Sequence, residues 1–296
     1  MPNPNDNAKL VIIGFPAGFN FGFDMYMWSV GDKFRGISQI PQGIHFVYYS
    51  GPGDEFRQGF FLDLKSNDTI VRKWDVQTEK LVPVPDLYEE ETLKQAAWRD
   101  FHLMAGMPPF SQCMDAELAN EWMSGSSFLT SSLLSRVSCT FKSTHQGGDD
   151  DETVLWTKFE NPSSMSPSEL TKFYMDKRYM LDQIIDPIGE LQLSFIVFLL
   201  GQNYEAFIQW RTLVEILLQS TIYPSLLSQL INVLPFQIKQ LPNDFLSDPI
   251  LEGPIFLIPL MADFLAEVSA PSLETAMSEK FGPTWKPVDD VVVIDI

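Results

Sequence analysis

The sequence predicts an α+β protein in which a β-rich, sandwich-like N-terminal domain precedes an all-helical C-terminal domain. Up to about residue 85, short β-branched and aromatic runs are separated by turn residues and do not follow helical spacing. From residue 167 onward, apolar residues recur at helical spacing behind clear capping signals. A chain of 296 residues, 45% of them hydrophobic, is long enough to bury two separate cores.

Short runs give the expected strands of the N-terminal domain, at residues 10–15, 44–49, 60–64 and 69–74. In the second run, strand alternation places Phe46 and Tyr48 on one face and Val47 and Tyr49 on the other. Both faces are largely apolar, which favours a sandwich or a covered sheet.

Turn chemistry separates these runs. Residues 65–68, Lys-Ser-Asn-Asp, predict a hairpin-like connection between the last two runs, because Asn and Asp tolerate turn dihedrals and bond their own backbone. Residues 51–54, Gly-Pro-Gly-Asp, mark another loop in the same way.

Between residues 86 and about 134 the pattern becomes helical. We expect Pro108 and Pro109 to end a first helix whose apolar stripe consists of Leu87, Leu93, Ala97, Phe101 and Met104. A second helix is expected near residues 115–123, followed by a short β-like piece at 137–141.

Glycine and acidic residues between 147 and 152 are typical of an exposed loop or linker. We therefore place the N-terminal domain with its trailing helices at residues 1–150, a linker at 151–166, the helical domain at 167–285 and an extended tail at 286–296.

Capping signals open the helical domain. Residues 166–169, Ser-Pro-Ser-Glu, predict a helix start, and Asp186 with Pro187 should stop this helix. Helices at 190–200 and 204–219 should pack antiparallel, because only a Gly-Gln-Asn turn joins them. Further helices are expected at residues 225–234, 255–268 and 272–281.

The tail ends in a β-branched run, Val291, Val292, Val293 and Ile294, behind a helical domain. Such a strand can add to an exposed sheet edge of another molecule. It can equally pair with the N-terminal β domain or fray in solution. The residues alone leave these alternatives open.

The formal net charge of −19 argues against a general phosphate-binding surface, because nucleic-acid affinity rests mainly on Lys and Arg. For any role near RNA we therefore expect a protein partner and no direct contact with nucleic acid.

Cofactor and membrane sites also lack their usual patterns. The two cysteines, Cys113 and Cys139, and three scattered histidines fit neither a disulfide scaffold nor a zinc cluster, so no cofactor is expected. The first fifteen residues lack a secretory signal, and the apolar residues 193–200 are too few to cross a membrane.

Catalytic patterns are weak. The glycine-rich residues 14–22 lack the Gly-Lys-Ser/Thr ending of a P-loop, so turns beside an aromatic cluster are the favoured interpretation. His45 lies within a strand and is expected to be a hydrogen-bonded structural residue. Asp24 and Asp32 could form a carboxylate pair, which keeps a hydrolase as the alternative function if the two converge in a pocket.

Two groups of motifs carry a resemblance to a known family. In the N-terminal half they are FGFD (21–24), WSVGDKFRGI (28–37), IPQGIHF (40–46) and GFFL (59–62). In the C-terminal half they are GELQ (189–192), FLLG (198–201) and YEAF (204–207), followed by Trp210. Together and in this order they resemble the A-one cistron splicing factor (Aar-two) family. Residues 113–157 resemble the family less clearly.

The resemblance implies a C-terminal domain of the VHS-like helical kind and no enzymatic activity. It also implies a function, because family members are cytoplasmic and nuclear assembly factors of the U-five small nuclear ribonucleoprotein. They bind the RNase H-like and Jab/MPN domains of the scaffold protein Prp-eight and keep the helicase Brr-two from binding early. In the family the C-terminal tail adds a strand to the interface, which favours residues 291–294 as a partner-binding strand.

Within the N-terminal motifs, glycines such as Gly22 are expected to permit turns. Lys33 and Arg35 either pair internally with Asp24 or Asp32 or face the partner. Internal pairing is the favoured interpretation.

Overall fold

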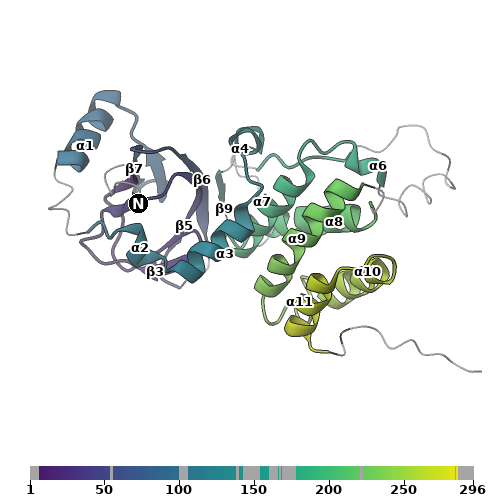
Figure 1. Ribbon diagram of the computed structural model, residues 1–296. Helices are drawn as coiled ribbons and strands as arrows, with labels where there is room; N and C mark the ends of the chain where they lie inside the picture. Colours follow the sequence, from purple (N-terminus) through teal and green to yellow (C-terminus); the bar gives the residue numbers. More distant parts are fainter. Residues whose placement is uncertain are drawn as a thin grey trace, which may run out of the picture. The chain divides into compact units, whose positions relative to one another are not determined.

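The computed structural model describes residues 7–53, 56–99, 106–137, 140–142, 154–159, 166, 168, 178–220, 223–283 and 285. It confirms the α+β class, with a two-sheet β region followed by helices (Figure 1). The chain divides into two compact units, one formed by Met1–Leu155 with Leu200–Glu205 and the other by Trp156–Leu199 with Ala206–Ile296. All described strands belong to the first unit.

Two sheets make up the β region of the first unit. One sheet orders its strands β4 (Gly36–Ile40), β1 (Ala8–Ile13), β7 (Thr69–Asp75) and β8 (Lys80–Pro83). The other orders β3 (Tyr26–Ser29), β2 (Asn20–Phe23), β5 (Gly43–Ser50), β6 (Gln58–Leu64) and β9 (Thr140–Lys142). Among the described strands, β1 and β7 pair in parallel and the other pairs are antiparallel. The four predicted strand runs correspond to β1, β5, β6 and β7, and the short β-like piece corresponds to β9.

An aromatic cluster that draws on both sheets forms the core of the β region. Its centre is Phe15, whose ring meets its neighbours edge to face at centroid distances of 5.3 to 6.2 Å; they are Phe19, Phe21, Phe34, Tyr49 and Trp74. Such edge-to-face contacts match the quadrupoles of the rings. The interpretation as turns beside packed aromatics is therefore confirmed at Gly14 and Gly18, which have positive φ, whereas residues 20–22 belong to strand β2.

Strand β5 is buried on both faces, as its sequence predicted. Val47 and Tyr49 belong to the aromatic core. Phe46 and Tyr48 face the other way, where the Phe46 ring packs against Phe61 with centroids 4.6 Å apart. From residue 45 to residue 50 every side chain of β5 is buried.

The connection at residues 65–68 is a turn but not a hairpin. Asn67 has a φ of 67°, and the Asp68 carboxylate accepts a hydrogen bond from the Lys65 amide at 2.8 Å, as the turn chemistry predicted. However, β6 pairs with β5 and β9, whereas β7 pairs with β1 and β8. The turn therefore passes the chain from one sheet to the other.

Helix α1 (Leu87–Arg99) departs from its predicted stripe. Leu93 packs against a small apolar cluster of Val11, Val71, Val84 and Met107. Leu87, however, is 79% exposed and is not part of this packing. The Asp86 carboxylate accepts from the Tyr88 amide at the start of the helix. Phe101 and Met104 lie outside the described residues.

The two prolines at 108 and 109 do not end α1. Residues 106–107 already lack helical structure, and the following segment runs beside β4, where Pro109 forms a bridge with Ser38. The Ser38 hydroxyl donates to the Met107 carbonyl at 3.1 Å. Three helices come next: α2 (Phe110–Cys113), α3 (Ala116–Ser126) and α4 (Ser131–Val137). The start of α3 at an Asp115 cap confirms the second predicted helix.

The second unit is helical in its described part, with α6 (Arg178–Leu181), α7 (Pro187–Leu199), α8 (Tyr204–Leu218), α9 (Pro224–Gln240), α10 (Gly253–Glu267) and α11 (Pro271–Phe281). In α7 every residue from 188 to 198 is buried, which is typical of a helix at the centre of a domain. The predicted antiparallel pair is confirmed, since Phe198 contacts Phe207 and Phe195 contacts Trp210.

Two helix boundaries in this unit differ from prediction. Pro187 was expected to stop a helix but instead begins α7, where its missing amide leaves no helical hydrogen bond unmade. Helix α9 continues past Leu234 and contains Pro235, because its buried residues pack against α7 and α11 on both sides of the proline. Most of the helix predicted from residue 167 lies outside the described residues.

Close packing of β2 on β5 makes Gly22 a test of this fold. A Cβ at Gly22 would lie 2.2 Å from Cζ of the buried Tyr48 ring, so Gly22→Ala should destabilise the β domain by about 1–3 kcal/mol. Gly31→Ala is the matched control, because no atom lies within 4 Å of its added Cβ, and it should change stability by about 0.5 kcal/mol or less. Hydrogen–deuterium exchange of β5 measures both effects. Equal protection in the two variants would contradict this packing.

Candidate functional site

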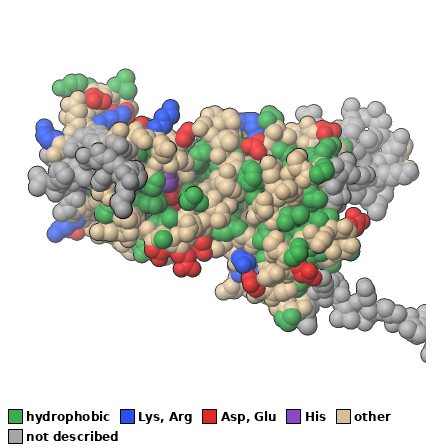
Figure 2. Space-filling view, in the orientation of Figure 1, with side chains coloured by type: hydrophobic (Ala, Val, Ile, Leu, Met, Phe, Trp, Pro, Cys, Tyr) green, Lys and Arg blue, Asp and Glu red, His purple; other side chains and the backbone are tan. Residues whose placement is uncertain are grey.

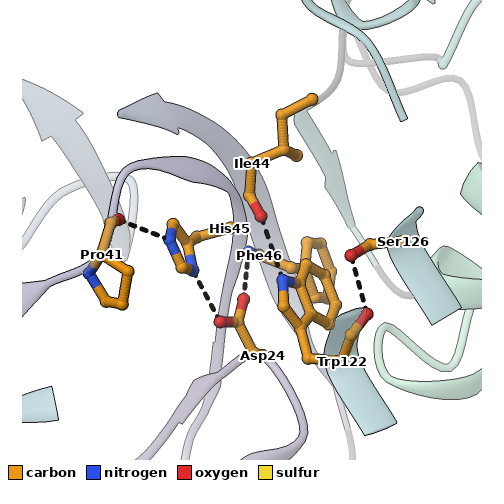
Figure 3. A network of polar contacts seen from close by, with 7 residues as sticks. All are labelled: Asp24, Pro41, Ile44, His45, Phe46, Trp122 and Ser126. Atoms are coloured by element: carbon orange, nitrogen blue, oxygen red, sulfur yellow. Dashed lines mark hydrogen bonds and ion pairs between the residues drawn. The ribbon is translucent and has the colours of Figure 1, made fainter. Parts of the chain in front are cut away.

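The buried pair of Asp24 and His45 is the most concentrated polar chemistry in the described β domain (Figure 3). Asp24 follows β2 in a turn with a φ of 52°, and His45 lies in the adjacent strand β5. His45 Nδ1 lies 2.7 Å from Asp24 Oδ2, and the Phe46 amide donates to Asp24 Oδ1 at 2.8 Å. Asp24 is 0% exposed, and these two contacts satisfy both of its carboxylate oxygens inside the protein.

Hydrogen bonding fixes the number of protons on this pair. His45 Nε2 lies 3.0 Å from the Pro41 carbonyl, which can only accept, so Nε2 carries a proton. The contact between Nδ1 and Oδ2 needs a second proton between the two atoms. The pair has no net charge in either arrangement, as imidazolium with carboxylate or as neutral imidazole with carboxylic acid.

Burial and pairing shift both groups. Burial raises the pKa of Asp24, and the imidazole and the Phe46 amide offset part of this rise. Burial alone would lower the pKa of His45, but the charge of Asp24 and the hydrogen bonds to Asp24 and Pro41 outweigh burial and raise this pKa. Both shifts favour retention of the proton that the two groups share.

Helix α3 attaches next to this pair. The indole Nε1 of Trp122 donates to the Ile44 carbonyl at 3.0 Å, and Ser126 donates to the Trp122 carbonyl at 2.7 Å (Figure 3). Ile44 directly precedes His45, so the pair and the indole hold the same end of β5. Together they connect a turn, a strand and a helix, which is a structural role.

The geometry does not bring together the carboxylates of the hydrolase alternative. Asp24 is buried with both oxygens engaged, whereas Asp32 is exposed. The guanidinium of Arg35 donates to the backbone carbonyls of Asp32 and Phe34. Within the described part of the chain, no ion pair joins Lys33 or Arg35 to Asp24 or Asp32, so the expected internal ion pairing is replaced by bonds from Arg35 to the backbone.

The described residues contain no group of three or more His, Cys, Asp or Glu side chains that could hold a metal ion. Burial raises the pKa of the Cys113 thiol to about 11, which suppresses the reactive thiolate. No helix among them is both long and apolar enough to cross a membrane. Cys139, His102 and His145 lie outside the described residues.

A second buried polar network lies in the helical unit. Glu190, in the first turn of α7, is 0% exposed and accepts from the Thr157 amide at 2.8 Å and the Thr157 hydroxyl at 2.7 Å. Gln209 of α8 donates to the same carboxylate at 2.9 Å. In the neighbouring contact, Trp210 Nε1 donates to Gln237 of α9 at 2.9 Å. These bonds fix the order in which α7, α8 and α9 pack.

Two family models match the chain. The AAR2 N-terminal domain matches residues 6–139, and the AAR2 C-terminal repeat region matches residues 153–292. The chain belongs to the AAR2 family. The resemblance seen in the sequence motifs is thereby confirmed in both halves of the chain.

Similar AAR2 proteins come from distant organisms. The Protein AAR2 homolog of Mus musculus is 28% identical, over 93% of this chain and 86% of that protein. The homolog of Homo sapiens is 26% identical over the same shares. The A1 cistron-splicing factor AAR2 of Saccharomyces cerevisiae is 21% identical, over 90% of this chain and 86% of that protein. The name of the yeast protein describes a splicing factor and states no catalytic activity.

The structure brings together some predicted residues and leaves others untested. The partner-binding strand predicted at Val291, Val292, Val293 and Ile294 lies outside the described residues and stays a prediction. Sequence reasoning considered Asp24 and His45 but did not pair them, and it missed Trp122. Adjacent placement of the two strands that carry the FGFD and IPQGIHF motifs was the signal that could have paired them.

Proton retention by Asp24 and His45 predicts a pH-dependent stability. Unfolded His45 loses its second ring proton near pH 6.5, while the folded pair keeps it because the folded pKa is raised. The contribution is therefore complete below about pH 6.5 and is lost as pH rises through the raised folded pKa, so stability of the β domain should fall as pH rises above about 6.5. Hydrogen–deuterium exchange of β5 at increasing pH measures it.

The variant Asp24→Asn tests whether the Asp24–His45 pair is the source of this pH dependence. Asn tolerates the positive φ at this position and can bond neutral His45, so the variant should lose the alkaline decline in stability. Asp32→Asn is the matched control and should keep the decline, because Asp32 is exposed. An unchanged decline in Asp24→Asn would exclude the pair as its source.

Proposed function

We propose that this chain is a pre-mRNA splicing factor that binds the scaffold protein Prp-eight during U-five snRNP biogenesis and blocks premature binding of the helicase Brr-two. The observation that carries the proposal is the match of both AAR2 family models, in order, along most of the chain. The splicing role follows the name of the yeast relative. The partner and the block are the functions that the family resemblance implies.

The proposed mechanism is steric and makes or breaks no bond. The factor occupies the RNase H-like and Jab/MPN surfaces of Prp-eight in the cytoplasm and nucleus, so a later partner must wait for its release. A net charge of −19 supports contact through protein and not through RNA. On the face shown in Figure 2, Lys and Arg side chains occur singly or in small groups and form no continuous band.

The tail supplies the second attachment in this proposal. Residues 291–294 are β-branched and would add a strand to a sheet edge of the partner, where backbone hydrogen bonds give affinity. A tail linked to a folded domain binds its own site at high effective concentration. Two modest contacts then give tight but reversible binding.

A pull-down with the RNase H-like and Jab/MPN fragments of Prp-eight tests the proposal. We expect the full chain to bind and a chain ending at Pro287 to bind at least about 10-fold more weakly. Val292→Pro should also weaken binding because it removes a strand amide, whereas Val292→Thr keeps the amide and the β-branch and should bind normally. Added Brr-two should compete with the full chain.

Each outcome separates one part of the proposal from the rest. Equal binding by the full and shortened chains would keep Prp-eight as partner and reject the tail strand. Binding of both proteins at once would reject the block of Brr-two. No binding of either fragment would reject Prp-eight as the partner.

A further inference from the structure

An aromatic pocket of about 230 Å³ opens at one end of the β sandwich. Four segments line it: Phe19 before β2, residues 49–52 at the end of β5, Phe56 and Gln58 at the start of β6, and Trp74 with Glu79 around the end of β7. β5 and β7 belong to different sheets, so the pocket lies where the two sheets separate.

Aromatic rings form the walls. The rings of Phe19 and Trp74 are inclined by 79° with centroids 5.5 Å apart, and those of Tyr49 and Trp74 by 75° at 5.8 Å. These rings pack edge to face on one another, and with Phe56 they make up the aromatic part of the lining. Phe56, at the pocket, is 60% exposed, which is high for so large an apolar side chain.

The charge of the lining is one-sided. Glu79 is its only charged residue, so the described lining contains a carboxylate and no Lys or Arg. Elsewhere in the protein, aromatic faces are covered by arginine at 5.1 to 5.4 Å, in the pairs Arg57–Tyr48, Arg72–Phe60 and Arg211–Phe256. The described lining therefore combines aromatic rings with one carboxylate.

Glu79 lies in the turn between β7 and β8, and its backbone has an unusual conformation. Glu79 has a φ of 52°, a conformation in which glycine or asparagine is usual. Its carbonyl accepts from the Gln58 side chain at 3.1 Å, which ties the turn after β7 to β6. This bond holds Glu79 beside the pocket.

We propose that this pocket binds the cationic side chain of an arginine or lysine presented by a basic segment of a partner protein. The aromatic walls attract the cation and Glu79 neutralises it, while the net charge of −19 draws a basic partner toward the surface. The carboxylate and the polar groups of Ser50 and Gln58 disfavour a purely apolar occupant. This inference holds whether or not the partner is Prp-eight.

Spectra of the full chain with ¹⁵N-labelled indoles test the proposal, with the Trp74 signal assigned by Trp74→Phe. The probes are acetylated, amidated tripeptides with glycine on either side of arginine, lysine, citrulline, norleucine or proline. Arginine and lysine peptides should shift the Trp74 signal with millimolar affinity, and each neutral counterpart should bind at least about 5-fold more weakly. Added salt should weaken only the charged probes.

Variants separate binding from folding. Glu79→Gly should fold at least as stably as the parent, because glycine adopts positive φ without strain, and yet bind arginine at least about 3-fold more weakly. Phe56→Ala should weaken binding as well. Glu117→Gln, at an exposed glutamate of α3, is the matched control and should bind normally.

Four results would overturn the proposal. Three concern the probes: equal binding of arginine and citrulline peptides, stronger binding of the proline peptide, and no shift of Trp74 at millimolar arginine peptide. The fourth is unchanged arginine affinity in a folded Glu79→Gly variant.

Discussion

A strand that is apolar on both faces must be covered on both sides, and β5 imposes this requirement on the whole β domain. One face meets the aromatic core around Phe15, and the other carries Phe46 and Tyr48 toward Phe61. Such cover removes water from the polar groups at the start of the strand, so these groups need partners inside the protein. Asp24, Pro41 and Trp122 supply them.

Helix α7 sets a related requirement in the helical unit. It is buried all round, so neighbouring helices must enclose it, and its polar side chains must be satisfied within that enclosure. Glu190 accepts three hydrogen bonds from Thr157 and Gln209. In both units, polar contacts at one end of a buried element therefore determine which segments pack there, whereas apolar contacts supply most of the stabilisation.

The sequence predicted what depends on local pattern and failed where distant contacts decide. Alternation identified β5, and the helical pattern placed α3 near residue 115, because both signals lie within a few residues. The turn at residues 65–68 was predicted correctly, but its local chemistry holds no information on the sheet that the next strand joins. The helix expected at residues 225–234 continues through Pro235 to Gln240, because burial of the residues around the proline outweighs one missing hydrogen bond.

The candidate site shows the same division. His45 was predicted to be a bonded strand residue, but its partner Asp24 lies 21 positions away and Trp122 a further 77 beyond His45, distances that no local pattern spans. Gly22 was expected to permit a turn, whereas it lies within β2 and leaves room for the Tyr48 ring. Several residues of the family motifs therefore make contacts between strands.

Burial of Cys113 gives the β domain an internal chemical reporter. Cys113 is 7% exposed and the pKa of its thiol is raised to about 11, so little reactive thiolate is present in the folded state for a maleimide or disulfide reagent. Cys113 belongs to the aromatic core cluster, so its alkylation requires that core to open. The rate of labelling at this sulfur, followed by mass spectrometry, would therefore measure how often the β sandwich opens in the intact chain.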